Sequence, residues 1–589
     1  MKVLKQLGVA LILLVVSASF ARAADGPFGE VARVVPGDVQ VYIELRDIAA
    51  LRQAWQGSSV LARLRETEMY REAVSSPGYN KFETGLAELE KQYGFTRDDA
   101  VKDLLGGTVG LAIRFTDTAP TPTTLLAVTG PTAGTLDRYA GIVSDIQEKD
   151  GKLKSSSGST YGDYKITTKV VVKQNRAGEL FDKTEHQVIT GNKFLASNDL
   201  DFLKQALDRL ADPKKPSVAT NERLAAAASA LPAGASAILV ADMPPVTQRF
   251  LSKSGLGAKV QNPIAKNILF TLRGYLESLS TQATGVYVKD TVRIVSQRLY
   301  SPEKITPSLR KLISSSASGA EALAILPPGT LGCLDVNFEP GALVAYLRDV
   351  LPPEGRERLE AVLETAKTFT ASPDASASAP EVLGGELTLA VSREGEGAPG
   401  VALILSLANP EVTRPRLEGA IGATVAWIAV DQRKKGNAFE IKAENVGESV
   451  VRSFGPVGPG GRLTPAYAFV GKYLVFSSSR EFVREIALTA ASPASGSLAR
   501  KDVVSAVLTG GQKPTRVLYV DIAQLGKVME EHKGALVAHH MRKKGGTIEK
   551  ARAEVDKLIE MVKLGGWLRA STTCEEGKIT TVLELAGRE

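Results

Sequence analysis

The sequence predicts an α+β fold made of two homologous halves, each with mixed or antiparallel sheets covered by helices. Three observations support this prediction. Short turns join many of the predicted strands, long helical segments join others, and the order strand, helices, strand, strand occurs repeatedly. Short turns between strands require antiparallel neighbours, whereas helical connections place helices against one face of the sheet.

The first copy of this order follows Pro36-Gly37-Asp38. Residues 39–45 form an apolar, β-branched run that predicts a buried strand, and residues 49–93 carry apolar side chains at helical spacing. Residues 108–115 and 123–129 predict two strands joined by a Pro-rich turn. Leu105-Gly106-Gly107 precedes this pair, where glycine is expected to supply the positive φ angle that is common after a helix.

Three further copies of the same order are predicted later in the chain, at 235–299, 330–407 and 515–585. Leu-Gly-Gly returns at 383–385 and 564–566, but no double glycine precedes Thr284. A strand-rich middle separates the two copies of each half. In the first half its predicted elements are a helix at 132–148, strands at 164–173, 185–190 and 193–197, and a helix at 199–210, with a polar Ser/Gly stretch at 155–160.

The chain begins with a predicted export signal, residues 1–23. It contains two lysines, an apolar run at 7–20 and a small-x-small site at Ala21-Arg22-Ala23. The run is shorter than the roughly 20 residues that a membrane-spanning helix needs, so we expect cleavage rather than a retained anchor. We therefore expect an extracytoplasmic protein, periplasmic or secreted, with no integral membrane span after cleavage. The first α+β half would occupy 24–307 and the second 308–589.

A Leu-Pro opening, a strand, helices and a Gly-Gly strand pair follow one another with similar spacing. Leu326-Pro327 and Gly384-Gly385 mark one example. This arrangement resembles a family of exported bacterial proteins of unknown function built from repeated α+β units. The resemblance covers most of the chain and implies an architecture, and no catalytic residues come with it.

Charge and cysteine content exclude several classes of protein. The formal charge of +7 falls to +4 when the predicted signal is removed. The basic clusters Lys214-Lys215, Arg433-Lys434-Lys435 and Arg542-Lys543-Lys544 are short and contain no aromatic residues, so no nucleic-acid partner is expected. Cys333 and Cys574 exclude a disulfide-dense scaffold, and the sequence leaves open whether they pair or remain free thiols.

Polar residues stand at the ends of the strands that open each copy: Asp47, Asp242 and Asp521, with Asn337 in the corresponding place. Carboxylates at such positions can bind metal ions or act as general bases. Asp and Asn are also preferred helix N-caps, because their side-chain oxygen accepts from amides of the first helical turn. Capping is the interpretation that we prefer.

His532, His539 and His540 form a histidine cluster and are the candidate metal ligands. On a helix, residues seven apart share a face but lie about 10 Å apart along the axis. That separation is too large for two imidazoles to bind one ion at ~2.0 to 2.1 Å. A polar helix face is therefore the preferred interpretation, and no cofactor is predicted.

These observations predict an exported non-enzymatic envelope protein with a binding or scaffolding role and an envelope protein as its partner. The sequence has no Gly-x-Ser-x-Gly elbow and no His-Glu-x-x-His motif, and no catalytic residue is assigned. The alternative is an exported hydrolase, with or without a metal ion, whose site forms between the two halves. His532 to His540 or the strand-end acids would then contribute to that site.

Overall fold

The computed structural model describes most of the chain. The described residues are 27–46, 48, 52, 56, 59–116, 121–174, 178–254, 263–289, 291–314, 319–370, 383–393, 399–436, 438–456, 464–492, 496–509 and 513–587. The predicted export signal and the strand-end residue Asp47 lie outside them, as do two stretches rich in small residues and proline, 371–380 and 458–462.

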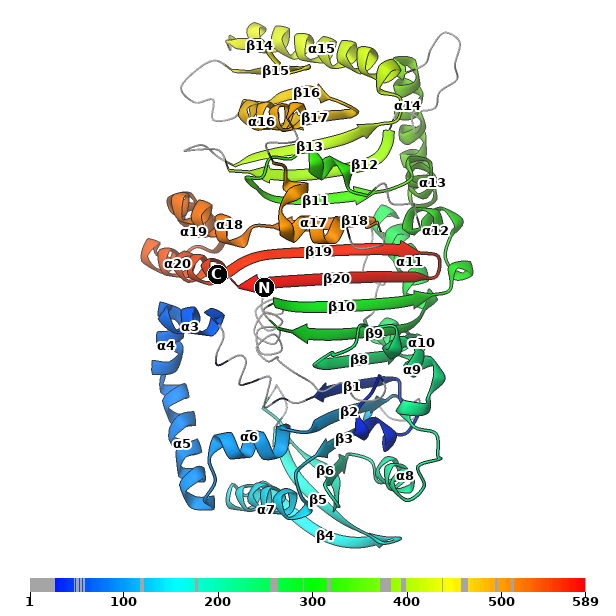
Figure 1. The fold of residues 1–589 in the computed structure, drawn as a ribbon, viewed down its shortest axis with the longest axis vertical. Helices are drawn as coiled ribbons and strands as arrows, with labels where there is room; N and C mark the ends of the chain where they lie inside the picture. Colours follow the sequence, from blue (N-terminus) through cyan, green and yellow to red (C-terminus); the bar gives the residue numbers. More distant parts are fainter. Residues whose placement is uncertain are drawn as a thin grey trace. The chain divides into compact units, whose positions relative to one another are not determined.

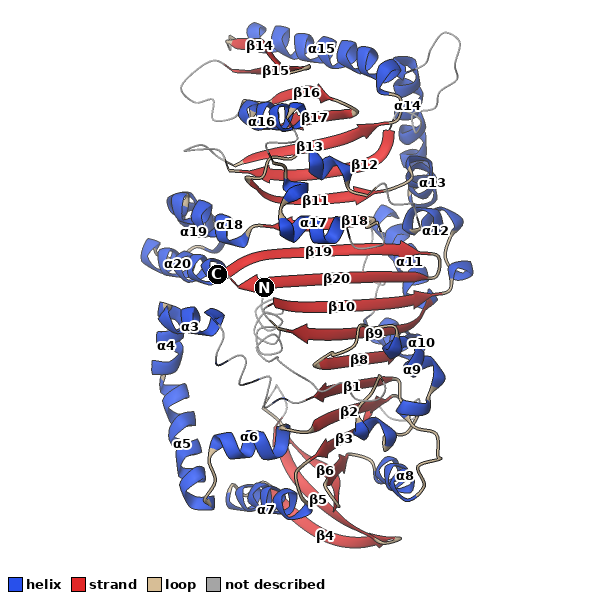
Figure 2. Ribbon diagram, in the orientation of Figure 1, coloured by secondary structure: helices blue, strands red, loops and turns tan. Residues whose placement is uncertain are grey.

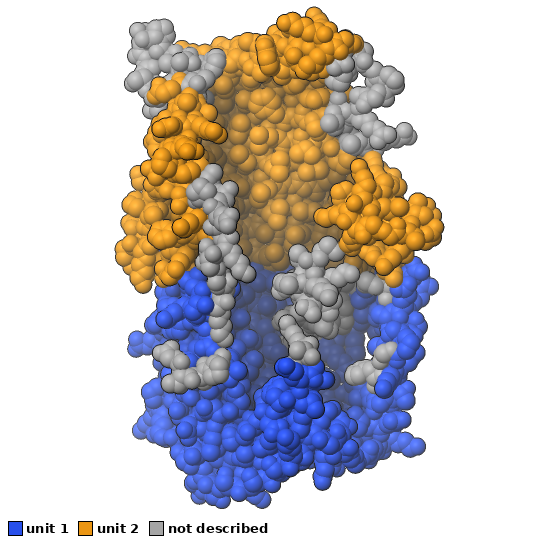
Figure 3. Space-filling model, turned by 180° about the vertical axis from the view of Figure 1, so that it is seen from behind, with its two compact units in different colours: residues 1–254, 279–300 blue, residues 255–278, 301–589 orange. Residues whose placement is uncertain are grey.

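The chain forms two compact units, coloured separately in Figure 3. Unit 1 holds Met1–Ser254 and Leu279–Tyr300, and unit 2 holds Gly255–Ser278 and Ser301–Glu589. The helix α11 (Pro263–Ser278) therefore belongs to unit 2, where the Asn267 side chain donates to the carbonyl oxygen of Val350 at 2.8 Å.

The strands of unit 1 form an antiparallel sheet in the order β10-β9-β8-β1-β2-β3-β7-β6-β5-β4 (Figure 1). The strands are β1 (Val41–Arg46), β2 (Thr108–Arg114), β3 (Thr123–Thr129), β4 (Leu153–Tyr161), β5 (Tyr164–Gln174), β6 (Leu180–Thr190), β7 (Lys193–Ser197), β8 (Ala237–Asp242), β9 (Leu279–Val288) and β10 (Thr291–Tyr300).

Unit 2 repeats this order with its own strands, as β20-β19-β18-β11-β12-β13-β17-β16-β15-β14. The strands are β11 (Thr330–Asn337), β12 (Leu383–Ser392), β13 (Gly400–Leu407), β14 (Phe439–Val446), β15 (Ser449–Pro456), β16 (Ala466–Val470), β17 (Tyr473–Ser477), β18 (Arg516–Val520), β19 (Gly565–Glu575) and β20 (Lys578–Gly587). The two sheets thus share one topology, and every described pairing in both orders is antiparallel.

Helices connect the strands in the order that the sequence predicts, so the α+β prediction is confirmed (Figure 2). The helices of unit 1 are α3 (Ser59–Glu66), α4 (Glu68–Ser75), α5 (Pro77–Tyr93), α6 (Arg97–Leu105), α7 (Ala133–Lys149), α8 (Leu200–Ala211), α9 (Glu222–Ser229) and α10 (Met243–Ser254). Those of unit 2, besides α11, are α12 (Pro307–Ile313), α13 (Pro340–Val350), α14 (Pro353–Thr370), α15 (Pro410–Lys434), α16 (Arg480–Ala491), α17 (Asp502–Leu508), α18 (Ile522–Glu531), α19 (Lys533–Lys544) and α20 (Ile548–Leu564).

Helices α8 and α16 occupy equivalent places and begin in the same way. The Asp199 side chain accepts from the amide of Phe202 at 2.7 Å, and the Ser479 side chain accepts from the amide of Phe482 at 3.2 Å. These caps satisfy amides that the first helical turn leaves unpaired. Both phenylalanines are fully buried, so each cap fixes the start of a helix whose apolar face packs into the core of its unit.

Short 3-10 turns of the two units are also bonded in corresponding ways to the segments that precede β1 and β11. The turn η2 (Val218–Thr220) begins with an amide that donates to the carbonyl of Val35 at 3.0 Å. The turn η7 (Leu498–Arg500) begins with an amide that donates to the carbonyl of Leu326 at 2.9 Å. Equivalent elements of the two units therefore share contacts as well as order.

The Leu-Gly-Gly segments differ from the prediction, because Gly106 has φ −75° and Gly565 has φ −77°. Only Gly385 combines the motif with a positive φ, +83°. Gly106 and Gly107 instead allow backbone carbonyl groups to approach them more closely than a side chain would permit. A Cβ atom would lie 2.3 Å from the carbonyl oxygen of Lys102 in the first case and 2.2 Å from that of Thr129 in the second.

Strand β4 contains the polar Ser/Gly stretch 155–160, whose sequence carries no strand pattern. Its side chains are mostly exposed, and its pairing with β5 extends from Tyr161 opposite Tyr164 to Leu153 opposite Val171. The tight turn at Gly162, with φ +56°, brings the two strands together. Pairing with a neighbour, rather than burial of its own side chains, therefore defines this strand.

Candidate ligand-binding site

Strand β11 of unit 2 buries a charged side chain on its inward face and exposes an apolar side chain on its outward face. Successive side chains of a strand point to opposite faces of the sheet. In β11, Cys333 and Asp335 are buried on the face that packs against α16 and α17, whereas Leu334, between them, is 40% exposed. At Leu334 and Asp335 this reverses the usual distribution of polar and apolar residues.

Leucines from three adjacent strands stand side by side on the outward face. Leu334 of β11 pairs with Leu389 of β12, which pairs with Leu403 of β13. These leucines are 40%, 42% and 36% exposed, and we call them the leucine row. Exposed apolar side chains that lie together mark interaction sites more often than isolated ones do. Seen from behind, the surface of unit 2 is hollowed between raised sides (Figure 3).

The register extends the leucine row under helix α15. Leu403 pairs with Phe476 of β17, and Phe476 pairs with Tyr467 of β16. Paired residues of antiparallel strands point to the same face, so Tyr467 lies on the outward face as well. There the side chains of Leu417 and Ile421 from α15 pack over a buried cluster that contains Tyr467.

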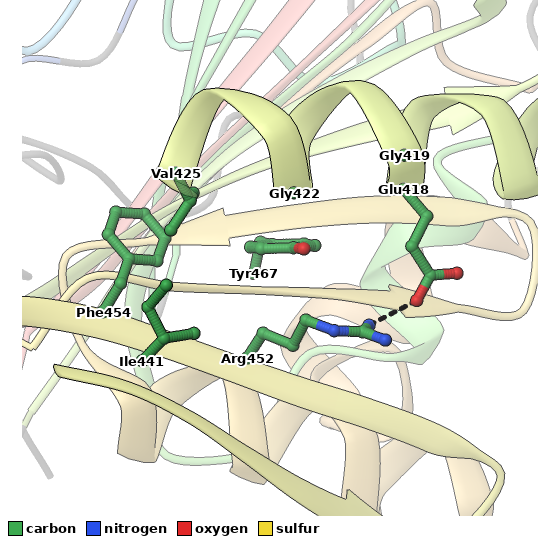
Figure 4. Close-up of a pocket in the computed structure, with 8 residues that line it drawn as sticks. All are labelled: Glu418, Gly419, Gly422, Val425, Ile441, Arg452, Phe454 and Tyr467. Atoms are coloured by element: carbon green, nitrogen blue, oxygen red, sulfur yellow. Dashed lines mark ion pairs between the residues drawn. The ribbon is translucent and has the colours of Figure 1, made fainter. Parts of the chain in front are cut away.

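A cavity of about 480 Å³ lies between α15 and strands β14, β15 and β16 (Figure 4). Its lining residues are Glu418, Gly419, Gly422, Val425, Ile441, Arg452, Phe454 and Tyr467. In the close-up, Val425, Ile441 and Phe454 gather at one end, while Glu418 and Arg452 face each other at the other end. This volume falls in the range of small-molecule sites, roughly 300–1,000 Å³.

The polar end of the cavity carries an ion pair. Arg452 Nη1 lies 2.5 Å from Glu418 Oε1, and its guanidinium lies 6.0 Å from the centre of the Tyr467 ring. A second guanidinium, that of Arg414, lies 5.7 Å from the ring centre of Phe469, whose ring is 6.5 Å from that of Tyr467. Within the lining of the cavity, one guanidinium and one carboxylate form this end, and Arg414 lies one turn earlier on α15.

The inward face of the same sheet holds a buried pair of carboxyl groups, Asp335 and Glu386. Thr388 Oγ1 donates to Asp335 Oδ2 at 2.5 Å, and Tyr473 OH donates to Glu386 Oε2 at 3.0 Å. Burial raises the pKa of Asp335 to about 8, and the charge of Glu386 adds to the shift. The amide of Ala322, in the 3-10 turn η4 (Glu321–Ala324), donates to Glu386 Oε1 at 2.8 Å. The pair therefore ties η4 to the sheet and has no access to a ligand on the outward face.

Unit 1 has a corresponding buried carboxylate. Glu44 of β1 is fully buried and accepts from Gly29 N at 2.7 Å, Tyr42 OH at 2.7 Å and Arg46 Nε at 2.6 Å. Gly29 precedes the 3-10 turn η1 (Glu30–Arg33), so a carboxylate again fastens a 3-10 turn to the sheet. We assign Glu44 to the stability of unit 1.

The described strand-end residues named from the sequence form hydrogen bonds or ion pairs within their own units. Asp521 Oδ1 accepts from the amide of Gln524 at 2.9 Å, which is the predicted helix cap. Asp242 forms an ion pair with Arg223 at 2.7 Å, and the Asn337 side chain donates to Asp335 at 3.3 Å.

Replacing Asp521 with alanine is expected to lower the free energy of unfolding by about 1 kcal/mol, because the amide of Gln524 loses its acceptor. Urea unfolding followed by circular dichroism measures the change. The Asp521→Asn variant is the control, because Asn caps helices as well as Asp does. If Asn costs as much stability as Ala, the negative charge rather than the cap is what α18 requires.

The histidine candidates lie around one helix. His532 stands between α18 and α19, His539 is exposed on α19, and His540 Nε2 lies 3.2 Å from a carboxylate oxygen of Glu554 on α20. Among the described residues, no group of three or more His, Cys, Asp or Glu is placed to hold a metal ion. The packing of α19 against α20 therefore brings His540 to a carboxylate, a contact that the spacing of the histidines does not predict.

The two cysteines are unpaired in this structure. Cys333 is buried in β11, and burial raises the pKa of its thiol to about 12. A thiol of this kind stays protonated and is a poor nucleophile. None of the helices that the structure describes has the length and apolar character needed to cross a bilayer.

No residue of the cavity was among the candidates named from the sequence. Gly419 and Gly422 supply the one sequence signal, because both occur within the 25-residue helix α15 and both line the cavity. Glycine inside a helix costs roughly 1 kcal/mol relative to alanine. A pair of glycines there is a reason to look for a close approach or a space.

Comparison with known proteins gives little similarity. No protein-family model matches the chain, and no curated protein matches it. Crystal form III of TP0453 is 12% identical, with 48% of this chain and 84% of that chain covered and a TM-score of 0.25. Crystal form IV of TP0453 is 11% identical, with 46% and 79% covered and a TM-score of 0.21. TM-scores this low show neither a shared fold nor a shared function.

Proposed function

We propose that this chain is an exported, non-enzymatic envelope protein that binds an apolar, chain-shaped molecule on the outward face of unit 2. The observation that carries the proposal is the leucine row, which continues through Phe476 to a cavity beneath α15. Burying the exposed part of these leucines under a ligand is favourable by roughly 25 cal/mol per Å² of apolar surface.

The contacts that the acidic residues make within the protein support a binding function over hydrolysis. Asp521 caps a helix, Asp242 is paired with Arg223, and Asp335 lies in the buried face of its sheet. A general base must reach the proton that it abstracts. The described acids at the strand ends are instead committed to contacts within their own units.

The proposal has two further parts, of which the repetition of topology supports the first and the sequence of residues 1–23 the second. The halves 24–307 and 308–589 are the products of an internal duplication, and residues 1–23 direct export. The shared strand order, the corresponding caps of α8 and α16, and the equivalent attachment of η2 and η7 support the duplication. A fragment spanning 24–307 that unfolds cooperatively would support independent halves, whereas an aggregated fragment would count against them.

The leucine row gives the direct test. The Leu389→Glu variant is expected to bind the neutral fluorescent probe N-phenyl-1-naphthylamine about 30-fold more weakly, because one leucine contact is worth roughly 2 kcal/mol. Fluorescence titration of the purified mature chain measures the dissociation constant. Leu389 is 42% exposed, so the substitution is expected to leave the unfolding midpoint nearly unchanged.

Leu488→Glu is the matched control, because Leu488 is 44% exposed on α16, away from the outward face. Its affinity for the probe should equal that of the unaltered chain. Equal affinity for all three proteins would refute a site on the leucine row. Envelope cross-linking tests the protein partner expected from the sequence: a protein captured only when Leu389 is present, with no probe binding, would make this face a protein interface.

A further inference from the structure

The cavity beneath α15 is open because two glycines form part of its roof. Gly419 and Gly422 lie one turn apart on α15, and a Cβ atom added to either would meet nothing within 4 Å. The neighbouring side chain Val425 is buried and reaches the strands. A larger side chain at Gly422, which is half-buried and lines the cavity, would therefore enter this space.

Polarity changes along the length of the cavity. Val425, Ile441 and Phe454 enclose the apolar end, and the Glu418–Arg452 pair closes the other end, with Tyr467 between them (Figure 4). Tyr467, in turn, pairs with Phe476, so the apolar surface continues onto the leucine row. A bound molecule would need both an apolar chain and a polar group.

The polar group that suits this end is an anion. The Glu418 and Arg452 side chains are each 30% exposed, and ion pairs at such exposure contribute little to stability. Exchanging Glu418 for a ligand carboxylate or phosphate therefore costs little. A guanidinium can bind either group through two parallel hydrogen bonds. Arg414, one turn before Glu418 on α15, adds a second positive charge to the same helix.

From these observations we infer that the cavity takes a single-chain amphiphile with an anionic head, carboxylate or phosphate. Arg452 holds the head, and the chain follows the apolar wall of the cavity. This inference rests on the proposed binding function and specifies the chemical class of its ligand.

The test compares four molecules with the same twelve-carbon chain by calorimetry below their micelle concentrations. Dodecanoate and dodecyl phosphate are expected to bind at least tenfold more tightly than dodecanol and dodecyltrimethylammonium. The tighter of the two anions identifies the head as that of a fatty acid or of a phosphate ester. Equal binding of dodecanoate and dodecanol, or tighter binding of the ammonium, would overturn the assignment of an anionic head.

Two variants locate the site. Arg452→Gln is expected to reduce dodecanoate binding at least tenfold while leaving dodecanol binding unchanged. Gly422→Leu fills the cavity and is expected to remove binding of all four molecules, and the helix keeps its structure because leucine is a better helix former than glycine. Gly141→Leu on α7 is the matched control, since a Cβ there also meets nothing within 4 Å.

If Gly422→Leu binds dodecanoate as the unaltered chain does, the cavity is not the site. Failure of this inference is distinguishable from failure of the proposed function. A chain that binds N-phenyl-1-naphthylamine through Leu389 but not dodecanoate refutes only the amphiphile. A chain that binds neither molecule refutes the apolar binding function as well.

Discussion

Replacing Glu44 with alanine is expected to lower the free energy of unfolding by about 3–5 kcal/mol, the cost of removing one partner from a buried ion pair. Glu44 has no exposed surface, and the Arg46 side chain is only 13% exposed. Without the carboxylate, Arg46 keeps its bond to the carbonyl of Pro27, but the amide of Gly29 and the hydroxyl of Tyr42 lose their acceptor. The start of η1 would then be released from the sheet.

Urea unfolding followed by far-ultraviolet circular dichroism measures this loss. Glu277→Ala is the control, because the Arg273–Glu277 pair has a similar separation, 2.7 Å, but both side chains are at least half exposed. An exposed pair contributes about 0–1 kcal/mol, so this control should change little. If Glu44→Ala and Glu277→Ala lower stability equally, the buried carboxylate does not hold η1 in place.

Replacing Asp335 with asparagine is expected to stabilise unit 2 above neutral pH and to flatten its stability between about pH 4 and pH 8. In the folded chain the pKa of Asp335 is raised to about 8 by burial, whereas its ordinary value is 3.8. As pH rises through this interval, the unfolded chain releases the proton and the folded chain retains it, so the stability of the unaltered protein falls. At about 1.36 kcal/mol per pKa unit, the change is on the order of several kcal/mol.

Asparagine has nearly the shape of aspartate and carries no charge to bury. Its side chain can still accept from Asn337 and can hydrogen-bond with Thr388. Its amide group can also donate to Glu386, the third hydrogen-bond partner of Asp335. Melting temperatures measured from pH 4 to pH 9 give the comparison, with Asp242→Asn as a control in an ion pair nearer the surface. Parallel curves for the Asp335→Asn variant and the unaltered chain would contradict a proton held at Asp335.

The order of helices and strands was predictable because the signals for it are local. Turn residues, helix caps and runs of apolar residues lie close together in the sequence. The predicted strand 39–45 is observed as Val41–Arg46, and the predicted helix 132–148 as Ala133–Lys149. Strand β4 was missed because it is defined by its pairing with β5 rather than by a pattern of its own.

Which side chains of a strand face the core and which face outward was not predictable in the same way. Hydrophobicity alone would bury Leu334 and expose Asp335, yet the structure does the opposite. A carboxylate flanked by apolar residues was the available signal, at Asp335 between Leu334 and Val336 and at Glu44 between Ile43 and Leu45. The reason for the inversion is partly non-local, because Glu44 also accepts from the amide of Gly29 and Asp335 from the hydroxyl of Thr388, which belong to other segments.

The cavity depends on long-range packing even more strongly. Arg452 and Glu418 are separated by a helix end and a strand, and their meeting depends on which side of α15 faces β15. No periodicity in the sequence specifies that orientation. The two glycines at 419 and 422 are the sequence signal that points to the cavity.

The position of β11 between β12 and β18 affects how the chain folds while it is being synthesised. Its second neighbour is made near the end of synthesis, so a nascent chain that has not reached Arg516–Val520 leaves one edge of β11 unpaired. Long-range strand pairing of this kind is slow because a long loop must close before the contacts form. Strand β11, which lies in the interior of this order, is thus among the last to gain both of its neighbours, and an unfinished chain keeps an open strand edge that other chains can join.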